Sequence, residues 1–344
     1  MSGTPPNTII PGTVIESRAH DVLGIGNAIV DVITHANDDF LGDNGLAKGA
    51  MTLIDAKTAA ALYGCMGTAV ESSGGSAANT IAGLASLGGR GAFIGKVRND
   101  QLGGIFAHDI RALGVTFDTL PATAGDPTAR CLIFVTPDAQ RTMQTFLGVS
   151  GSLGPADIDE AQVRAAAITY LEGYLWDPPE AKKAFEKAAK IAHDAGNTVA
   201  LTLSDAFCVD RHRADFLRLV EGHVDILFAN ESEILSLYQV DNFDDALQKV
   251  RGHCQVAALT RSEKGSVVVS GEEVHVVDAV HVGKVVDTTG AGDLYAAGFL
   301  HGLTQGKSLN DCGRIGALCA GEIISHYGAR PEASLAELVT KALA

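Results

Sequence analysis

The stretch from Val286 to Phe299 reads VDTTGAGDLYAAGF, and it constrains the fold more than any other part of this 344-residue chain. It predicts a glycine turn between an apolar strand over residues 283–286 and an apolar helix over residues 291–303. Asp293 falls in the first turn of that helix. Backbone N–H groups at a helix start have no intrahelical partners, and the helix dipole favours negative charge there. The turn is therefore a candidate anion-binding site.

The residues of this turn have complementary chemistry. Gly290, Ala291 and Gly292 would present backbone N–H groups to a bulky anion, because glycine lets the backbone approach closely. The Asp293 carboxylate beside them can take a proton from a hydroxyl while a phosphoryl group is held nearby. The alternative is that Asp293 only compensates the helix dipole. The pattern predicts phosphoryl transfer, with Asp293 as catalytic base and Gly290, Ala291 and Gly292 as the anion hole.

A second glycine-rich element lies far upstream. Residues 73–80 read SGGSAANT and open an expected helix over residues 76–87. Gly75 permits close backbone approach, and Asn79 is an unusual residue one turn into an otherwise apolar helix. A glycine turn with a serine N-cap would explain the same letters.

Together the two elements resemble the signatures of the ribokinase-like (phosphofructokinase-B type) carbohydrate and nucleoside kinases. The strings D-T-x-G-A-G-D at 287–293 and G-G-x-x-x-N at 74–79 occur in the order that this family shows. The resemblance covers roughly residues 21–330. It implies a three-layer α/β/α core with a mainly parallel sheet, a small β-sheet lid, and a requirement for ATP and Mg²⁺. Dependence on a monovalent cation such as K⁺ is left open.

The chain pattern agrees with such a fold, because strand and helix signals alternate along most of the length. Two stretches with strand patterns interrupt the alternation, and one contains a strand, a turn and a returning strand over residues 131–143. The resemblance implies that the two stretches pair into a lid. The predicted organisation is an N-terminal arm (1–20), a large nucleotide-binding α/β core (21–30, 74–115 and 149–344) and a small β lid (31–73 and 116–148).

The resemblance also assigns residues to the phosphoryl acceptor. Residues 26–31 resemble the G-N-x-x-x-D element of adenosine kinases, in which Asn27 and Asp31 would hold the ribose hydroxyls. Gly75 and Asn79 would contact the substrate as well. Sugar kinases of the family carry an aspartate at the same position, so Asp31 indicates a polyol without specifying a base.

A purine would need an aromatic or apolar slot. Leu203–Phe207 resembles the L-S-x-x-F string of adenosine kinases, whose phenylalanine faces the purine, so Phe207 is a candidate wall. Ile29 and Met143 are further candidates, although core packing would explain each of the three. Arg141 aligns with a lid arginine of adenosine kinases that reaches phosphate.

Two segments resemble the nucleotide-binding elements of the family. Residues 230–233 read NESE and resemble the N-x-x-E element, in which Asn230 touches the triphosphate and Glu233 organises Mg²⁺ through water. Capping of a helix at a strand end is the alternative. Residues 260–265 match the family's nucleotide loop, in which Thr260, Ser262 and Gly265 would contact ATP.

Composition excludes several other classes of function. The net charge of −15 argues against nucleic acid or an anionic membrane as a partner, and no apolar run is long enough to span a membrane. The first 20 residues lack the pattern of a signal peptide, and the six cysteines form no C-x-x-C pair. We therefore expect a cytoplasmic protein with reduced thiols and small-molecule substrates. The sequence leaves open whether it is a monomer or a homodimer.

These observations predict an ATP-dependent kinase that phosphorylates the 5′-hydroxyl of adenosine to give AMP, a reaction of purine salvage. The first alternative is a kinase of the same family for ribose, fructose or 2-keto-3-deoxygluconate. A nucleotide-binding regulator without turnover is a second alternative, which the presence of Asp293 disfavours.

Overall fold

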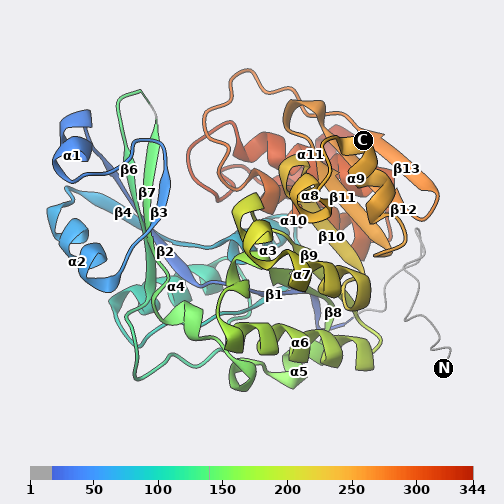
Figure 1. Ribbon diagram of the computed structural model, residues 1–344, viewed down its shortest axis with the longest axis horizontal. Coiled ribbons are helices and arrows are strands. Elements are labelled where there is room, and N and C mark those ends of the chain that lie inside the picture. Colours follow the sequence, from blue (N-terminus) through green and yellow to red (C-terminus); the bar gives the residue numbers. More distant parts are fainter. Residues whose placement is uncertain (1–17, 139, 344) are drawn as a thin grey trace.

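The computed structural model describes residues 18–138 and 140–343 and contains a large α/β core beside a smaller β-rich lobe (Figure 1). Most of the predicted N-terminal arm, residues 1–17, lies outside the described residues. Within the described part of the chain, no helix is both long and apolar enough to cross a membrane.

An eight-stranded sheet forms the centre of the core, with the order β13-β12-β11-β10-β9-β8-β1-β5. The pairings from β5 to β11 are parallel, and the hairpin formed by β12 and β13 adds two antiparallel pairings at one edge. The strands of this sheet are β1 (His20–Ile25), β5 (Gly91–Ile94), β8 (Ala166–Glu172), β9 (Thr198–Thr202), β10 (Ile226–Asn230), β11 (Val256–Thr260), β12 (Ser266–Ser270) and β13 (Glu273–Val277).

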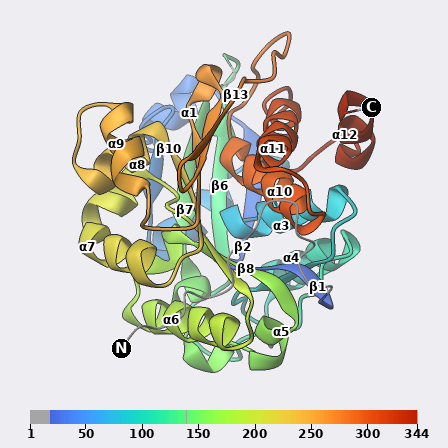
Figure 2. The same ribbon diagram turned by 90° about the vertical axis from the view of Figure 1, so that its right-hand side faces the viewer.

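Helices cover both faces of the core sheet because its parallel strands are apolar on both sides. Val256 and Ala258 of β11 pack into one buried cluster, whereas their neighbours Ala257 and Leu259 pack into another. Figure 2 shows the two helical layers on either side of the sheet. One layer contains α3 (Ser76–Ser86), α4 (Gln101–Ala112), α10 (Ala291–Thr304), α11 (Leu309–Ile323) and α12 (Leu335–Leu343). The other contains α5 (Glu160–Arg164), α6 (Pro179–Asp194), α7 (Ala206–Gly222), α8 (Glu231–Tyr238) and α9 (Phe243–Val250).

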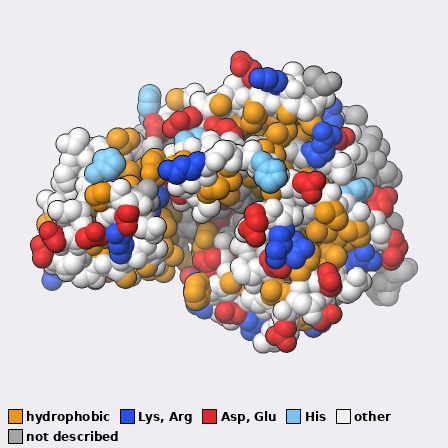
Figure 3. Space-filling view, turned by 90° about the horizontal axis from the view of Figure 1, so that it is seen from above, with side chains coloured by type: hydrophobic (Ala, Val, Ile, Leu, Met, Phe, Trp, Pro, Cys, Tyr) orange, Lys and Arg blue, Asp and Glu red, His pale blue; other side chains and the backbone are white. Residues whose placement is uncertain are grey.

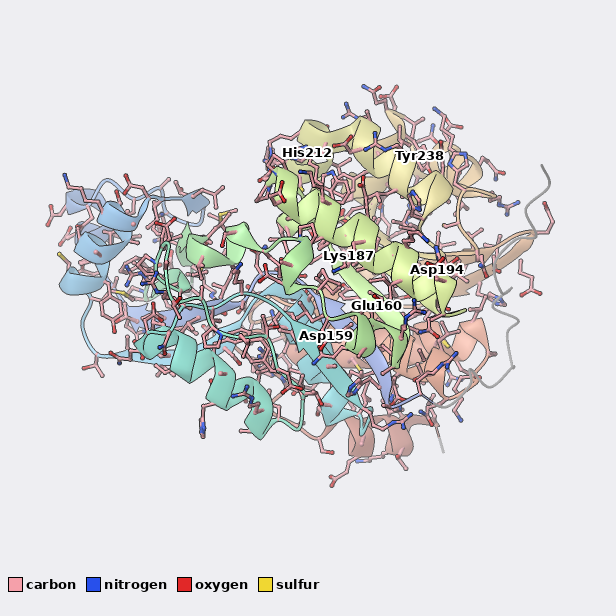
Figure 4. All side chains as sticks on the ribbon, turned by 90° about the horizontal axis from the view of Figure 1, so that it is seen from below. Asp159, Glu160, Lys187, Asp194, His212 and Tyr238 are labelled. Atoms are coloured by element: carbon pink, nitrogen blue, oxygen red, sulfur yellow. The ribbon has the colours of Figure 1, made fainter. Side chains whose placement is uncertain are left out.

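The second layer is fixed by polar contacts as well as by apolar packing. Seen from below, Lys187 of α6 lies near the start of α5, which Asp159 caps (Figure 4). The Lys187 Nζ donates to the carbonyl oxygens of Pro155 at 2.7 Å and Ile158 at 3.2 Å. These bonds hold the entry to α5 against α6. Short 3₁₀ turns connect further elements: η1 (Gly148–Ser152), η2 (Pro155–Asp157), η3 (Gly173–Trp176) and η4 (Ser262–Lys264).

The smaller lobe is the predicted lid, built on a five-stranded mixed sheet with the order β3-β7-β6-β2-β4. Its strands are β2 (Ile29–His35), β3 (Met51–Leu53), β4 (Ala69–Gly74), β6 (Ala129–Val135) and β7 (Arg141–Phe146). The parallel pairing of β2 with β6 joins the two excursions into one sheet, as the sequence predicted. The three-layer core and the accessory sheet together confirm the expected ribokinase-like architecture.

The structure corrects several details of the predicted elements. The first excursion also contains two helices, α1 (Asp38–Asp43) and α2 (Ala56–Cys65), so it is not purely β. In the second, Thr116 and Ala122 form isolated bridges to Ala92 and Arg98, and regular strand begins only at β6.

One predicted element next to the site was also wrong. No strand forms over residues 283–286: the Val286 N–H donates to the carbonyl of Ile324 at the end of α11, so this segment lies against a helix end instead of a strand. Helix α7, next to the site, begins at Ala206, because the Asp205 side chain caps it by accepting from the Cys208 N–H.

Candidate active site

The core and lid lobes flank a hollow that is visible from above (Figure 3). The N-terminus of α3 meets the N-terminus of α10 through side-chain hydrogen bonds. Ser76 Oγ donates to Asp293 Oδ1 at 2.6 Å, and Asn79 Nδ2 donates to Asp293 Oδ2 at 2.9 Å. The two sequence elements that pointed to a kinase therefore converge on one carboxylate.

The environment of Asp293 suits a proton acceptor. Desolvation raises the pKa of Asp293 above its ordinary value, while the hydrogen bonds from Ser76 and Asn79 and the positive charge of Arg330 act in the opposite direction. The Oδ1 atom of Asn79 is buried and has no partner among the described residues. Each Asp293 oxygen thus accepts one protein hydrogen bond and retains lone pairs that a hydroxyl can approach.

The turn before α10 has the backbone that an anion hole requires. Gly290 caps α10 with φ of 81°, and a Cβ there would lie 2.9 Å from the Cβ of Ala329. At Gly292, in contrast, an added Cβ would meet nothing within 4 Å. The Ala291 N–H donates to the Thr288 carbonyl at 3.2 Å. Gly290 is therefore needed for the turn itself, and Gly292 keeps the approach to the helix start open.

Asp31 of the lid strand β2 belongs to the same electrostatic environment. Desolvation raises the pKa of Asp31 to about 6, with the nearby negative charge of Asp293 adding to the rise and the charges of Arg141 and Arg330 opposing it. The Asp31 carboxylate packs on Gly74, where an added Cβ would lie 2.5 Å from Asp31 Oδ2. Gly75 follows with φ of 99°, and a Cβ there would lie 2.2 Å from the Asn27 carbonyl oxygen.

Asn27 is buried, and its side chain is held by the protein. Its Nδ2 donates to Glu172 Oε1 at 2.7 Å, and its Oδ1 accepts from Ser150 Oγ at 2.9 Å. Glu172 also accepts from the Ala77 N–H at 2.8 Å, in the first turn of α3. Asn27 therefore links β1 to the start of α3, and its contact with ribose stays a prediction.

Sequence reasoning missed Glu172, a buried carboxyl at the end of β8. Desolvation raises its pKa to about 7, against the opposing effect of the hydrogen bonds from Ala77 and Asn27. One signal could have found it: a carboxylate at the carboxyl end of a parallel strand lies where ligands bind in α/β sheets.

The lid arginine Arg141 contacts the signature turn directly. Its guanidinium pairs with the Asp287 carboxylate and donates to Thr289 Oγ1 at 3.1 Å. The two side chains of the ion pair are only 9% and 6% exposed. Desolvation would raise the pKa of Asp287, but hydrogen bonds from Gly328 and Thr289 and the charge of Arg141 hold it below its ordinary value. Arg141 thus joins the lid to the loop that carries the predicted anion hole.

The expected purine slot is assembled only in part. Ile29 and Met143 both pack against the buried lid residues Cys131, Ile133 and Val135. Phe207 lies in the first turn of α7, and its side chain is 76% exposed. Its contact with a purine therefore stays a prediction that requires the ligand to cover an exposed ring.

The element at 230–233 forms a helix cap in this structure. Asn230 Oδ1 accepts from the Glu233 N–H at 2.9 Å, and Glu233 Oε2 accepts from the Asn230 N–H at 3.0 Å, which is a reciprocal capping box at the start of α8. Desolvation raises the pKa of Glu233 to about 7, and the charges of Asp205 and Asp293 add to this rise. The helix cap is thus present, and the capping residue Glu233 lies within electrostatic reach of two other carboxylates.

The predicted nucleotide loop follows β11, the strand beside β10. Thr260 ends β11, and Ser262 and Gly265 have positive φ values of 52° and 79°. A Cβ at Gly265 would lie 2.0 Å from the Val277 carbonyl oxygen, so the loop needs glycine there. Roles for Thr260, Ser262 and Gly265 in binding ATP stay predictions.

Comparison with known proteins identifies the family. Residues 54–335 match the pfkB family of carbohydrate kinases. This chain belongs to that family. As a pfkB-family kinase it is a phosphotransferase with an alcohol group as acceptor.

Two solved structures resemble this pfkB-family kinase over 94% of its chain and 99% of theirs, each with a TM-score of 0.88. One is an adenosine kinase from Sinorhizobium meliloti, 56% identical, and the other is a probable sugar kinase protein from Rhizobium etli, 54% identical. An ATP-dependent ribose-1-phosphate kinase from Halopiger xanaduensis is 33% identical over 73% of this chain and 81% of its own.

Arg330 is the second site residue that the sequence did not reveal in this pfkB-family kinase. It follows α11 in an irregular segment, and its guanidinium donates to the carbonyl of Ser73 and to the carbonyl of Ala78 in the first turn of α3. No local pattern marks an arginine in such a segment as part of a site that forms more than 250 residues upstream.

Proposed function

We propose that this pfkB-family kinase transfers the γ-phosphoryl group of ATP to the 5′-hydroxyl of adenosine. The observation that carries the acceptor is the high identity, over nearly the whole chain, to the adenosine kinase from Sinorhizobium meliloti. The local arrangement agrees with it, because Asp31 on β2 pairs in register with Cys131, a member of the apolar cluster against which Ile29 and Met143 pack.

In this proposal Asp293 removes the proton from the acceptor hydroxyl as the bond to phosphorus forms. Positioning matters more than basicity in such a step, and the hydrogen bonds from Ser76 and Asn79 supply it. The N–H groups of Gly290 and Gly292 would stabilise negative charge on the transferred phosphoryl group, and that of Ala291 would do so on leaving its bond to the Thr288 carbonyl. Arg141 would add positive charge at the same turn.

Mg²⁺ would accompany ATP, and the residues fit this requirement through water. The negative charges of Asp205 and Asp293 act on Glu233, and a divalent cation would neutralise this excess of negative charge. Both Glu233 oxygens accept from Asn230, so water would mediate the contact. Among residues 18–138 and 140–343, no group of three or more acidic, His or Cys side chains could hold a metal directly. When bound with ATP, Mg²⁺ neutralises charge on the phosphates.

The test is a direct acceptor screen. Purified protein is incubated with ATP and Mg²⁺ and with adenosine, ribose, fructose or 2-keto-3-deoxygluconate, and ADP and the phosphorylated product are quantified. We expect AMP to form from adenosine with the highest kcat/KM. A free sugar as the much better acceptor would overturn the proposal and favour the sugar-kinase alternative, whereas no turnover with any acceptor would contradict kinase activity itself.

A further inference from the structure

The segment Ser73–Asn79 joins lid strand β4 to core helix α3 and contacts three carboxylates of the transfer site. Asp31 packs on Gly74, and Asp293 accepts from Ser76 and Asn79. Glu172 accepts from the Ala77 N–H, so the segment is held from the core side as well. Small shifts of residues 73–79 would therefore move both Asp31 and Asp293 relative to a substrate.

Arg330 spans this segment. Its Nε and Nη2 donate to the Ser73 carbonyl at 3.1 and 3.0 Å, and its Nη2 also reaches Ser73 Oγ at 3.1 Å. Its Nη1 donates to the Ala78 carbonyl at 2.7 Å. Asp109 of α4 accepts from the Ser73 N–H at 3.0 Å, so Ser73 is fixed on both sides of its backbone. A planar fork with fixed donor directions can hold two carbonyl groups in this way, whereas an ammonium group cannot.

The guanidinium also lies within electrostatic reach of both substrate-facing carboxylates. Its charge acts to lower the pKa of Asp31 and that of Asp293. Desolvation in turn lowers the pKa of Arg330 to about 10, while the charges of Asp31, Asp293 and Asp109 act to raise it. All of the described hydrogen bonds of Arg330 go to neutral groups, so none of them pairs its charge directly with a carboxylate.

From this geometry we propose that Arg330 is a positioning residue of the transfer site. Its fork sets the path of residues 73–79, and its charge allows two neighbouring carboxylates, Asp31 and Asp293, to be ionised together. The inference rests on the proposed kinase function. Like charges that share a site oppose one another's ionisation, and a cation nearby relieves that effect.

Other titratable groups lie within electrostatic reach of the same carboxylates and set the background for any measurement. These come from the lid, the core sheet and the opposite helical layer: Arg141, Tyr170, Glu172, Tyr174 and Glu233. Only Arg141 among them is a cation, and it pairs with Asp287. Arg330 therefore supplies positive charge that no direct partner neutralises.

Three variants separate charge from geometry. Arg330→Met removes both, Arg330→Lys keeps the charge and loses the fork, and Arg314→Met removes a half-exposed arginine of α11 that pairs with Asp311 at 3.3 Å. For Arg330→Met we expect kcat to fall about 10- to 100-fold and the acidic limb of kcat/KM to move upward by about one pH unit. Arg330→Lys should lower kcat without moving the acidic limb of the kcat/KM profile. Arg314→Met should match the wild type in both.

Carboxyl-carbon NMR of aspartate-labelled protein tests the same idea without any acceptor. Asp31→Asn and Asp293→Asn assign the two resonances, whose titration should move upward in Arg330→Met and not in Arg330→Lys. An unchanged titration in Arg330→Met, or a rate loss that is uniform with pH and follows a loss of stability, would overturn the proposal. Because the titration needs no turnover, its outcome is independent of whether adenosine is the acceptor.

Discussion

Replacing Asp293 by Asn tests the central element of the site, because it removes the proton acceptor and keeps nearly the same shape. Ser76 Oγ can still donate to the amide oxygen of the new side chain, whereas the Asn79 Nδ2 would face an NH₂ group. The Asn79 Oδ1 has no partner among the described residues, so a flip of the Asn79 amide would let this oxygen accept a hydrogen bond from the new NH₂ group. The structural cost is then at most about one hydrogen bond, or about 1–3 kcal/mol.

The electrostatic balance reduces even this cost at neutral pH. The pKa of Asp293 is raised, so the folded state binds its proton more tightly than the unfolded chain does. Ionising Asp293 therefore destabilises the fold as pH rises through that range, and an uncharged Asn avoids this penalty. We expect the thermal midpoint at neutral pH to change little.

The catalytic cost should be far larger. Loss of a general base typically lowers the rate about 10²- to 10⁴-fold, which corresponds to about 3–5 kcal/mol of barrier. Single-turnover rates with saturating adenosine and ATP, measured beside calorimetric Kd values for both, should show lost chemistry with nearly unchanged binding.

A matched control exists in the neighbouring helix. Asp311 occupies the third position after the cap of α11, just as Asp293 does after the Gly290 cap of α10. Asp311→Asn removes the same dipole-compensating charge away from the site and should leave turnover unchanged. If Asp293→Asn behaved like Asp311→Asn and kept near-normal turnover, Asp293 would be a helix-dipole residue and the assigned mechanism would be wrong.

Three further predictions address the anion hole, the acceptor pocket and the lid. Gly292→Val fills the open space beside the helix start, so kcat should fall about 10²- to 10³-fold with an unchanged thermal midpoint, and a fully active variant would exclude this turn as a phosphate site. Phe207→Ala should lower adenosine affinity about 10- to 100-fold and spare ribose phosphorylation, whereas Asp31→Ala should weaken both acceptors; equal effects of Phe207→Ala on both would refute a purine contact. Amide hydrogen exchange over residues 31–73 and 116–148 should slow when adenosine binds, and unchanged protection in both would argue against a closing lid.

The sequence by itself determined the class of fold and the central chemistry. The alternation of apolar strands and amphipathic helices depends on local periodicity, which is written in the residues themselves. The glycine turn and Asp293 could be predicted for the same reason. The start of a helix and the positive φ of Gly290 both depend on residues that are close together in the sequence. The resemblance of two short strings then sufficed to predict the family that residues 54–335 match.

Local patterns failed where an element's state depends on its neighbours. Residues 283–286 have the composition of a strand but lie against the end of α11, where the Ile324 carbonyl accepts from Val286. The first lid excursion contains helices α1 and α2, which lie between strands and were not predicted. In each case local propensity did not determine the backbone conformation, and tertiary packing did.

Only the tertiary structure decided which residues share the site. Ser76 and Asp293 are 217 residues apart in the chain, and Arg330 is 257 residues from Ser73, yet each pair is hydrogen-bonded. The positions of Glu172, Asp287 and Arg330 depend on how the sheet order and the lid bring distant loops to one edge. Residue type fixes what a side chain can donate or accept, but its partner is set by the packing of whole elements, which no short segment encodes.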